Sequence, residues 1–215
     1  MTVNVSTLEN GIRVVTESMP RVETVSCGVW VGTGARNETA DVNGVAHLLE
    51  HMAFKGTERR SAQDIVEEIE SVGGHLNAYT SREQTAYYAK VLKENTGLAL
   101  DLLSDILQNS TFDAEELERE RTVVIQEIGQ AHDTPDDLIF DHFQTVAFPD
   151  QPLGRPVLGS VETVGNMPRE TIMGHMSAGY GGDRMVLSAA GNLEHDAFVQ
   201  AASDLFDKIP PQAQE

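Results

Sequence analysis

The chain contains 215 residues, of which 40% are hydrophobic and 23% are charged, a composition typical of a globular protein. No apolar run approaches the roughly 18 residues that a membrane-spanning helix requires, so the sequence predicts no membrane insertion. The 15 Lys and Arg residues against 34 Asp and Glu residues give a formal net charge of −19. Such a surface repels nucleic acid and attracts cations or basic peptides.

The cysteine content restricts the kinds of site that the chain can form. Cys27 is the only cysteine, so no internal disulfide and no thiolate zinc cluster is possible. Any metal must therefore be held by histidine and carboxylate groups. The segment 1–10 has neither the basic nor the apolar region of a signal peptide, and we expect a cytoplasmic location.

The first part of the chain predicts two strands and two helices. Alternating β-branched segments predict strands over 11–17 and 24–34, which we expect to pair with each other. An apolar stripe predicts a short helix over 45–55, with Asn43 as its N-cap, and another helix begins at Ser61.

The rest of the chain mixes strands and helices without strict alternation. Long helices are expected from Asp113 to about Ala131 and from Thr134 onwards. The other expected elements are strands over 75–80, 84–92 and 184–190 and helices over 98–107, 168–175 and 194–209. This order predicts an α+β fold with a mostly antiparallel sheet and helices on one face. With no repeat and no linker, residues 1–215 are expected to form one domain.

Two histidines and a glutamate share one face of the helix predicted over 45–55. At about 100° per residue, His47, Glu50 and His51 project within an arc of roughly 100°. A catalytic zinc site needs three protein ligands, an open position and a nearby base. The order His-x-x-Glu-His is the inverted zincin signature. The pattern indicates a metal site, and the alternative is an ordinary amphipathic helix.

The helix predicted from Asp113 offers a third ligand. Glu120 and Glu127 are seven residues apart and therefore point to the same side. The apolar residues around Val124 and Ile128 predict that this helix is largely buried. A carboxylate buried there requires a partner, which a metal would supply.

These segments resemble a known family. The stretch from His47 to Thr57, and Glu127 within Val-Val-Ile-Gln-Glu-Ile, resemble the pitrilysin-type metallopeptidases, the inverted zincins with an HxxEH motif. The processing-peptidase branch, with its bacterial homologues, is the most similar. Segments 73–80 and 153–159 add to the resemblance, which extends over essentially the whole chain.

The resemblance implies a zinc-dependent metalloendopeptidase that hydrolyses extended peptides through a metal-activated water. It makes His47, His51 and Glu127 the ligands of one Zn²⁺ per chain. It makes Glu50 the general base, which takes a proton from the water and later passes it to the leaving amine. Glu120 matches a further catalytic glutamate, which we interpret as orienting a histidine; a solvated helix glutamate is the alternative.

The resemblance also implies where a peptide binds. An extended peptide would add to an exposed sheet edge formed by Asn77, Ala78, Tyr79 and Thr80. A paired interior strand is the alternative. Phe54 corresponds to the pocket for the residue after the cleaved bond, or else belongs to the core.

An acidic pair predicts side-chain specificity. Asp137 and Asp141 lie on one helix face, and two like charges there cost stability unless a cation joins them. The resemblance makes them the acceptor of a substrate arginine, so a basic, presequence-like peptide is expected. The alternative is a solvated helix face.

Members of the family resemble two such domains in tandem. We therefore expect 1–215 to be an N-terminal catalytic domain that needs a second homologous domain or subunit, and to be weakly active or inactive alone. One rival is a noncatalytic scaffold subunit, although such relatives tend to lose the metal residues. Another is a lyase of related fold that cleaves S-ribosylhomocysteine, which needs a cysteine ligand downstream of the motif, whereas Cys27 lies upstream.

Overall fold

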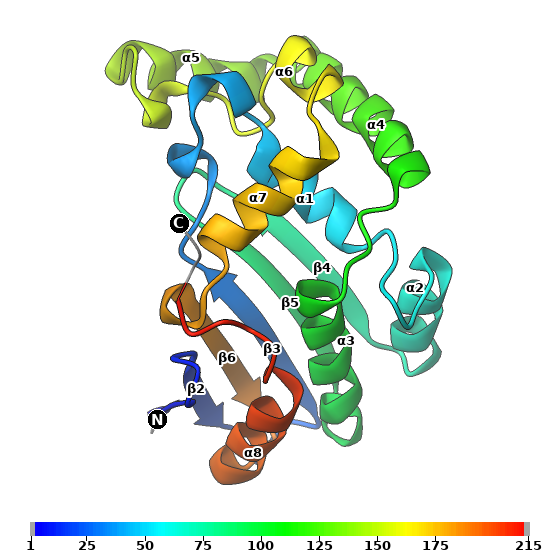
Figure 1. The fold of residues 1–215 in the computed structure, drawn as a ribbon. Helices are drawn as coiled ribbons and strands as arrows, with labels where there is room; N and C mark the ends of the chain where they lie inside the picture. The colour runs from blue at the N-terminus through cyan, green and yellow to red at the C-terminus, as the bar shows by residue number, and fades with distance from the viewer. Residues whose placement is uncertain (1–2, 213–215) are drawn as a thin grey trace.

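A six-stranded sheet forms the frame of residues 3–212, the part of the chain that this computed structural model describes (Figure 1). The strands are β1 (Val3–Thr7), β2 (Arg13–Ser18), β3 (Thr24–Val31), β4 (His75–Thr80), β5 (Thr85–Leu92) and β6 (Met185–Gly191). Their order across the sheet is β1-β2-β6-β3-β5-β4. Neighbouring strands are antiparallel except β2 and β6, which are parallel. The predicted α+β class with a mostly antiparallel sheet is confirmed.

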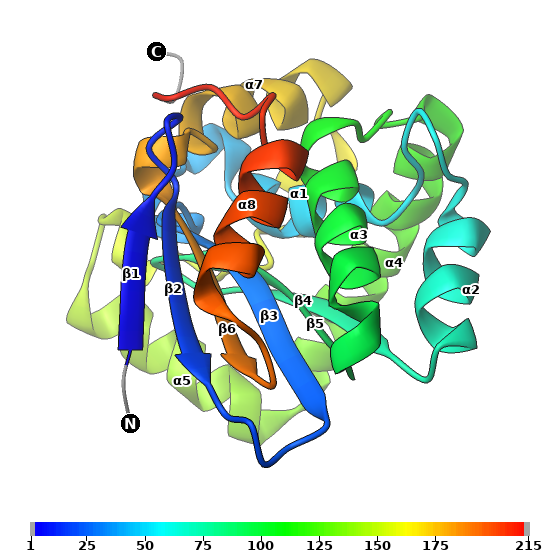
Figure 2. The same ribbon diagram turned by 90° about the horizontal axis from the view of Figure 1, so that it is seen from below.

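Helices α1, α3 and α8 cover one face of this sheet (Figures 1 and 2). The helices are α1 (Val45–Ala53), α2 (Ala62–Ser71), α3 (Thr96–Gln108), α4 (Ala114–Asp133), α5 (Pro135–Ala147), α6 (Val161–Gly165), α7 (Arg169–Gly179) and α8 (His195–Leu205). Helix α1 contacts α4, α7 and β4, which places it at the centre of the molecule. Within residues 3–212, no helix is both long and apolar enough to cross a membrane.

The core lies between the sheet and the helices. In β3, Cys27 and Val29 are buried on the helix-facing side, whereas Ser26 on the opposite side is exposed. Cys27 is the small buried residue that a valine-rich strand favours, and burial raises the pKa of its thiol to about 12. In α1, Leu48 and Met52 are completely buried. The position of α1 is therefore fixed by core packing.

The predicted pairing of the strands over 11–17 and 24–34 is wrong. Strand β6 lies between β2 and β3, with Leu187 opposite Val14 on one side and opposite Val29 on the other. This pairing brings together segments more than 150 residues apart, which no local pattern reveals. Strand β1 was also missed, because Val3 and Val5 are exposed and give no buried stripe.

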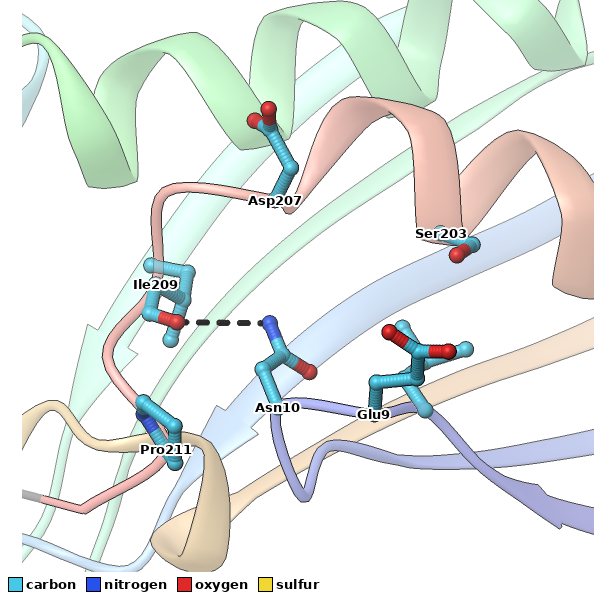
Figure 3. Close-up of a pocket in the computed structure, with 7 residues that line it drawn as sticks. Glu9, Asn10, Ser203, Asp207, Ile209 and Pro211 are labelled. Atoms are coloured by element: carbon cyan, nitrogen blue, oxygen red, sulfur yellow. Dashed lines mark hydrogen bonds between the residues drawn. The ribbon is translucent and has the colours of Figure 1, made fainter.

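The two ends of the described chain contact each other beside α8. Asn10 donates from Nδ2 to the carbonyl oxygens of Phe206, at 2.8 Å, and Ile209, at 3.4 Å. Figure 3 shows Asn10 in a pocket that Glu9 and Asp207 also line. The pocket contains none of the residues proposed for the metal site.

The histidine of α7 generates a prediction about acid stability. His175 has a buried Nε2 without a hydrogen-bond partner among the described residues, and burial lowers its pKa to about 4 from 6.5. Between those pH values the unfolded chain binds the proton and the folded chain does not. The contribution of His175 to stability is therefore complete above pH 6.5 and falls as pH drops towards 4, by up to about 1.4 kcal/mol per pH unit.

We expect His175→Gln to flatten the pH dependence of the free energy of unfolding between pH 4.5 and 6.5. Urea denaturation at several pH values measures it. The matched control is His132→Gln, at an exposed position on α4, which should keep the slope of the original chain. Equal slopes in both variants would show that His175 titrates normally.

Candidate metal centre

The N-terminus of α1 is held by a buried carboxylate that the sequence did not reveal. Gly44 is the N-cap, with φ of 98°, in place of the predicted Asn43. Glu38 accepts hydrogen bonds from the backbone N–H groups of Gly44, at 2.9 Å, and Ala46, at 2.8 Å. Asn43 donates its side-chain amide to the same carboxylate, at 2.7 Å. Burial raises the pKa of Glu38, while these hydrogen bonds act to lower it. Glu38 therefore supplies the acceptor expected of the N-cap residue, from a position six residues before Gly44.

His47, His51 and Glu127 come together from α1 and α4. Glu127 Oε2 lies 3.7 Å from His47 Nε2 and 3.5 Å from His51 Nε2. One ligand atom from each of the three residues lies within 4.8 Å of the others. Tetrahedral zinc with bonds of about 2.0–2.1 Å separates its ligand atoms by about 3.3 Å. The donor set and its spacing therefore fit one divalent metal ion, and no other such group occurs among residues 3–212.

The two histidines of this group are mostly buried, but the glutamate is not. Burial, helped by His51, lowers the pKa of His47 to about 4, so His47 is neutral near pH 7. The side chain of Glu127 is 39% exposed, so its predicted burial is wrong. Helix α4 buries only a stripe that includes Val124 and Ile128, and Val123 is exposed. Glu127 projects from the rim of that stripe.

Glu120 lies behind His51. Its side chain is 6% exposed, and Oε2 accepts a hydrogen bond from His51 Nδ1 at 2.9 Å. The other oxygen, Oε1, lies 2.7 Å from Lys55 Nζ. The alternative of a solvated helix glutamate is therefore wrong. Lys55 is a neighbour of the site that the sequence interpretation missed.

Glu50 lies beside the His47, His51 and Glu127 group and contacts β4. The hydroxyl of Thr80 donates to Glu50 Oε2 at 2.5 Å. Burial raises the pKa of Glu50, while the hydrogen bond from Thr80 and the charge of His51 act in the opposite direction. A partly buried carboxylate with a raised pKa is suited to accepting a proton. The contact also gives Thr80 a side-chain role beyond the predicted strand edge.

Strand β4 is an edge strand, as the peptide-binding hypothesis requires. It pairs with β5 and has no strand on its other side within the described chain. The alternative of an interior strand is therefore wrong. Asn77 and Tyr79 are exposed, whereas Ala78 packs partly against the core. The Tyr79 hydroxyl accepts a hydrogen bond from Trp30 Nε1 at 3.3 Å, on the sheet face opposite α1.

Phe54 directly follows α1. Its ring centroid lies 6.2 Å from that of buried Tyr87, and the side chain is only partly buried. It thus contributes to the edge of the core and also reaches the surface. Its place in a substrate pocket stays a prediction.

One carboxylate of the acidic pair on α5, that of Asp141, already has a cationic partner. Arg82, in the turn between β4 and β5, lies with its guanidinium 2.7 Å from Asp141 Oδ1 and also donates to the carbonyl of Leu153 at 3.1 Å. Asp137 is exposed. The two carboxylates are therefore not equivalent, which the sequence alone did not indicate.

The fold and the site together define a class, an α+β domain with a candidate His-His-Glu metal centre. The model of the insulinase family, peptidase family M16, matches residues 13–161. The chain belongs to this family, which confirms the resemblance found in the sequence.

Several relatives match nearly the whole chain. A probable mitochondrial-processing peptidase beta subunit of Arabidopsis thaliana is 47% identical over 205 residues, covering 95% of this chain and 39% of the relative. A protein of Bacillus subtilis (strain 168) named as an uncharacterized zinc protease is 44% identical, with 93% and 49% covered. A solved protease from Helicobacter pylori shares the fold, with a TM-score of 0.93, 24% identity, and coverage of 100% of this chain and 52% of that chain. The chain thus spans about half or less of the length of these relatives.

The buried cap of α1 should contribute measurably to stability. In Glu38→Ala, the N–H groups of Gly44 and Ala46 lose their acceptor, and each buried unsatisfied donor costs about 1–3 kcal/mol. We expect the free energy of unfolding, measured with urea, to fall by about 2–6 kcal/mol. Glu38→Gln keeps an acceptor oxygen and should lose less. Exposed Glu9→Ala is the control, and a Glu38→Ala variant as stable as this control would refute the assignment.

Proposed function

We propose that the chain is the zinc-binding catalytic domain of a metalloendopeptidase that cleaves extended peptides. The observation that carries the proposal is the meeting of His47, His51 and Glu127 beside Glu50. The names of the relatives, a processing peptidase and a zinc protease, support the same activity.

In this proposal, His47, His51 and Glu127 hold one zinc ion per chain. When bound, zinc supplies Lewis acidity that activates water and polarises a peptide carbonyl. Glu50 takes a proton from the attacking water and passes it to the leaving amine. Thr80 holds one oxygen of Glu50 through its hydroxyl, which leaves the other oxygen for the proton. Glu120 fixes the ring of His51 from behind.

The peptide would lie along β4. Pairing through the main chain does not depend on side-chain identity, and the free edge runs from Asn77 to Thr80, the residue that contacts Glu50. Phe54, at the end of α1, would line the pocket for the residue after the cleaved bond. A peptide on this edge would be held next to the base.

A second homologous domain or subunit would complete the catalytic chamber. The relatives are about twice as long as this chain or longer, which supports this arrangement. Helix α5 supports it too, because its outer face leaves large apolar side chains exposed, as surfaces that meet a partner do. They are Ile139, Phe140, Phe143 and Val146.

The rival functions receive less support. A scaffold subunit would not need two histidines and a glutamate at ligand spacing. The lyase alternative needs a cysteine ligand, and Cys27 is buried in β3.

Metal content tests the ligand assignment. We expect close to one zinc per purified chain, measured by mass spectrometry of the metal after gel filtration. His47→Ala, His51→Ala and Glu127→Ala should lose stoichiometric zinc, because each removes one of three ligands. Glu50→Gln should keep the zinc and abolish cleavage of a fluorogenic peptide by the complete assembly. Full zinc retention in Glu127→Ala would refute the third ligand.

Arginine preference tests the role of α5. We expect the complete assembly to favour arginine just before the cleaved bond. Asp137→Asn should reduce that preference, measured as kcat/KM, by about ten- to a hundredfold, which corresponds to the free energy of one charged hydrogen bond. Asp141→Asn should have a smaller effect, because Arg82 already pairs with Asp141.

The comparison uses matched Arg and Ala peptides at low and high salt. A general attraction to the net charge of −19 weakens with salt, whereas a partly desolvated pair keeps most of its effect. If the Asp137→Asn/Asp141→Asn double variant retains the full preference at both salt levels, α5 is only a solvated face.

A further inference from the structure

The lysine that follows the metal helix contacts the carboxylate behind His51. We propose that Lys55 is a positioning residue of the metal centre and that it acts on His51 through Glu120. The inference rests on the proposed function, because it assumes that His51 binds the metal.

Three side chains form a continuous chain of contacts. Lys55 Nζ lies 2.7 Å from Glu120 Oε1, and Glu120 Oε2 lies 2.9 Å from His51 Nδ1. Each oxygen of Glu120 thus has its own donor. The side chain of Glu120 is 6% exposed and that of Lys55 is 29% exposed. The pair is therefore mostly shielded from water.

The backbone after α1 brings Lys55 to this position. Helix α1 ends at Ala53, and the N–H of Lys55 still donates to the carbonyl of Met52 at 3.2 Å. Gly56 then has φ of 117°, a backbone conformation that residues other than glycine rarely adopt. The chain turns away directly after Lys55, which leaves its side chain beside Glu120.

The physical effect of Lys55 is to hold the carboxylate in one orientation. A buried carboxylate is costly unless each oxygen has a partner. With Lys55 on Oε1, Oε2 is fixed where it accepts the Nδ1–H of His51. The proton is thereby kept on Nδ1, and Nε2 presents its lone pair towards Glu127, 3.5 Å away. Without the ammonium group, the carboxylate can rotate and the imidazole loses its fixed acceptor.

A second lysine pair provides a matched control. Lys93 Nζ lies 2.7 Å from Glu23 Oε2, the same distance as in the Lys55 pair, but these side chains are 45% and 71% exposed. Exposed pairs contribute little, so Lys93→Met removes the same charge without touching the metal centre.

The first experiment measures the zinc dissociation constant by competition with a chromophoric chelator. We expect Lys55→Met to weaken zinc binding by about 10–100-fold, the range for loss of a group that supports a metal ligand. Lys55→Arg keeps a cationic donor and should restore most of the affinity. Lys93→Met should bind zinc like the original chain. Unchanged affinity in a folded Lys55→Met variant would overturn the proposal.

A double-mutant cycle tests whether Lys55 acts through Glu120. We expect Glu120→Gln to weaken zinc binding, and the addition of Lys55→Met to that variant to weaken it no further. An undiminished effect of Lys55→Met in the Glu120→Gln background would mean that Lys55 acts by another route.

A third measurement uses the original chain, so it does not depend on whether a variant folds. Nitrogen-15 NMR of the zinc-loaded original chain should show His51 Nδ1–H hydrogen-bonded to Glu120, and an Nδ1–H without that hydrogen bond would overturn the proposal. Absence of zinc binding in the original chain would refute the proposed function itself, which distinguishes the two failures.

Discussion

The candidate metal centre depends on the fixed position of α1 between the sheet and α4. His47 and His51 lie on the one side of α1 that is not filled by core residues such as Leu48 and Met52. Because the opposite side is completely buried, the helix cannot rotate without opening the core. Glu127, from α4, then lies at ligand spacing from two imidazole nitrogens. The packing of the core thus sets the geometry of the site.

A second constraint is that this strongly acidic chain buries or partly buries three carboxylates near α1. Glu38 is satisfied by backbone and amide N–H groups, Glu50 by Thr80, and Glu120 by Lys55 and His51. A buried charge without such partners would cost several kcal/mol. Each carboxylate is therefore fixed in orientation by its donors. The same interactions that make the charges tolerable also align α1, Glu50 and His51.

The sequence predicted the parts of the site that depend on local spacing. His47, Glu50 and His51 lie within five residues of one helix, so helical geometry alone predicted that they share a face. Strand β4 was predicted at its observed bounds because its sequence, His-Leu-Asn-Ala-Tyr-Thr, has the alternation that matches its alternating burial. The Lys55–Glu120 contact and the insertion of β6 between β2 and β3 were not predictable in this way, since they join distant segments. The contact of Glu38 with the N–H of Ala46 is local, but it is made by an irregular loop before α1 that has no periodic pattern. The exposure of Glu127 was missed because the apolar residues of α4 suggested that the whole helix is buried, whereas only one stripe of it is.

The central claim is that two imidazoles and one carboxylate of this chain bind zinc, and X-ray absorption at the zinc edge tests it most directly. We expect two histidine nitrogens and oxygen ligands at about 2.0–2.2 Å, with the multiple scattering of imidazole rings. The signal of one imidazole should disappear in His47→Ala. A sulfur ligand at about 2.3 Å, or a spectrum without imidazole, would contradict the account.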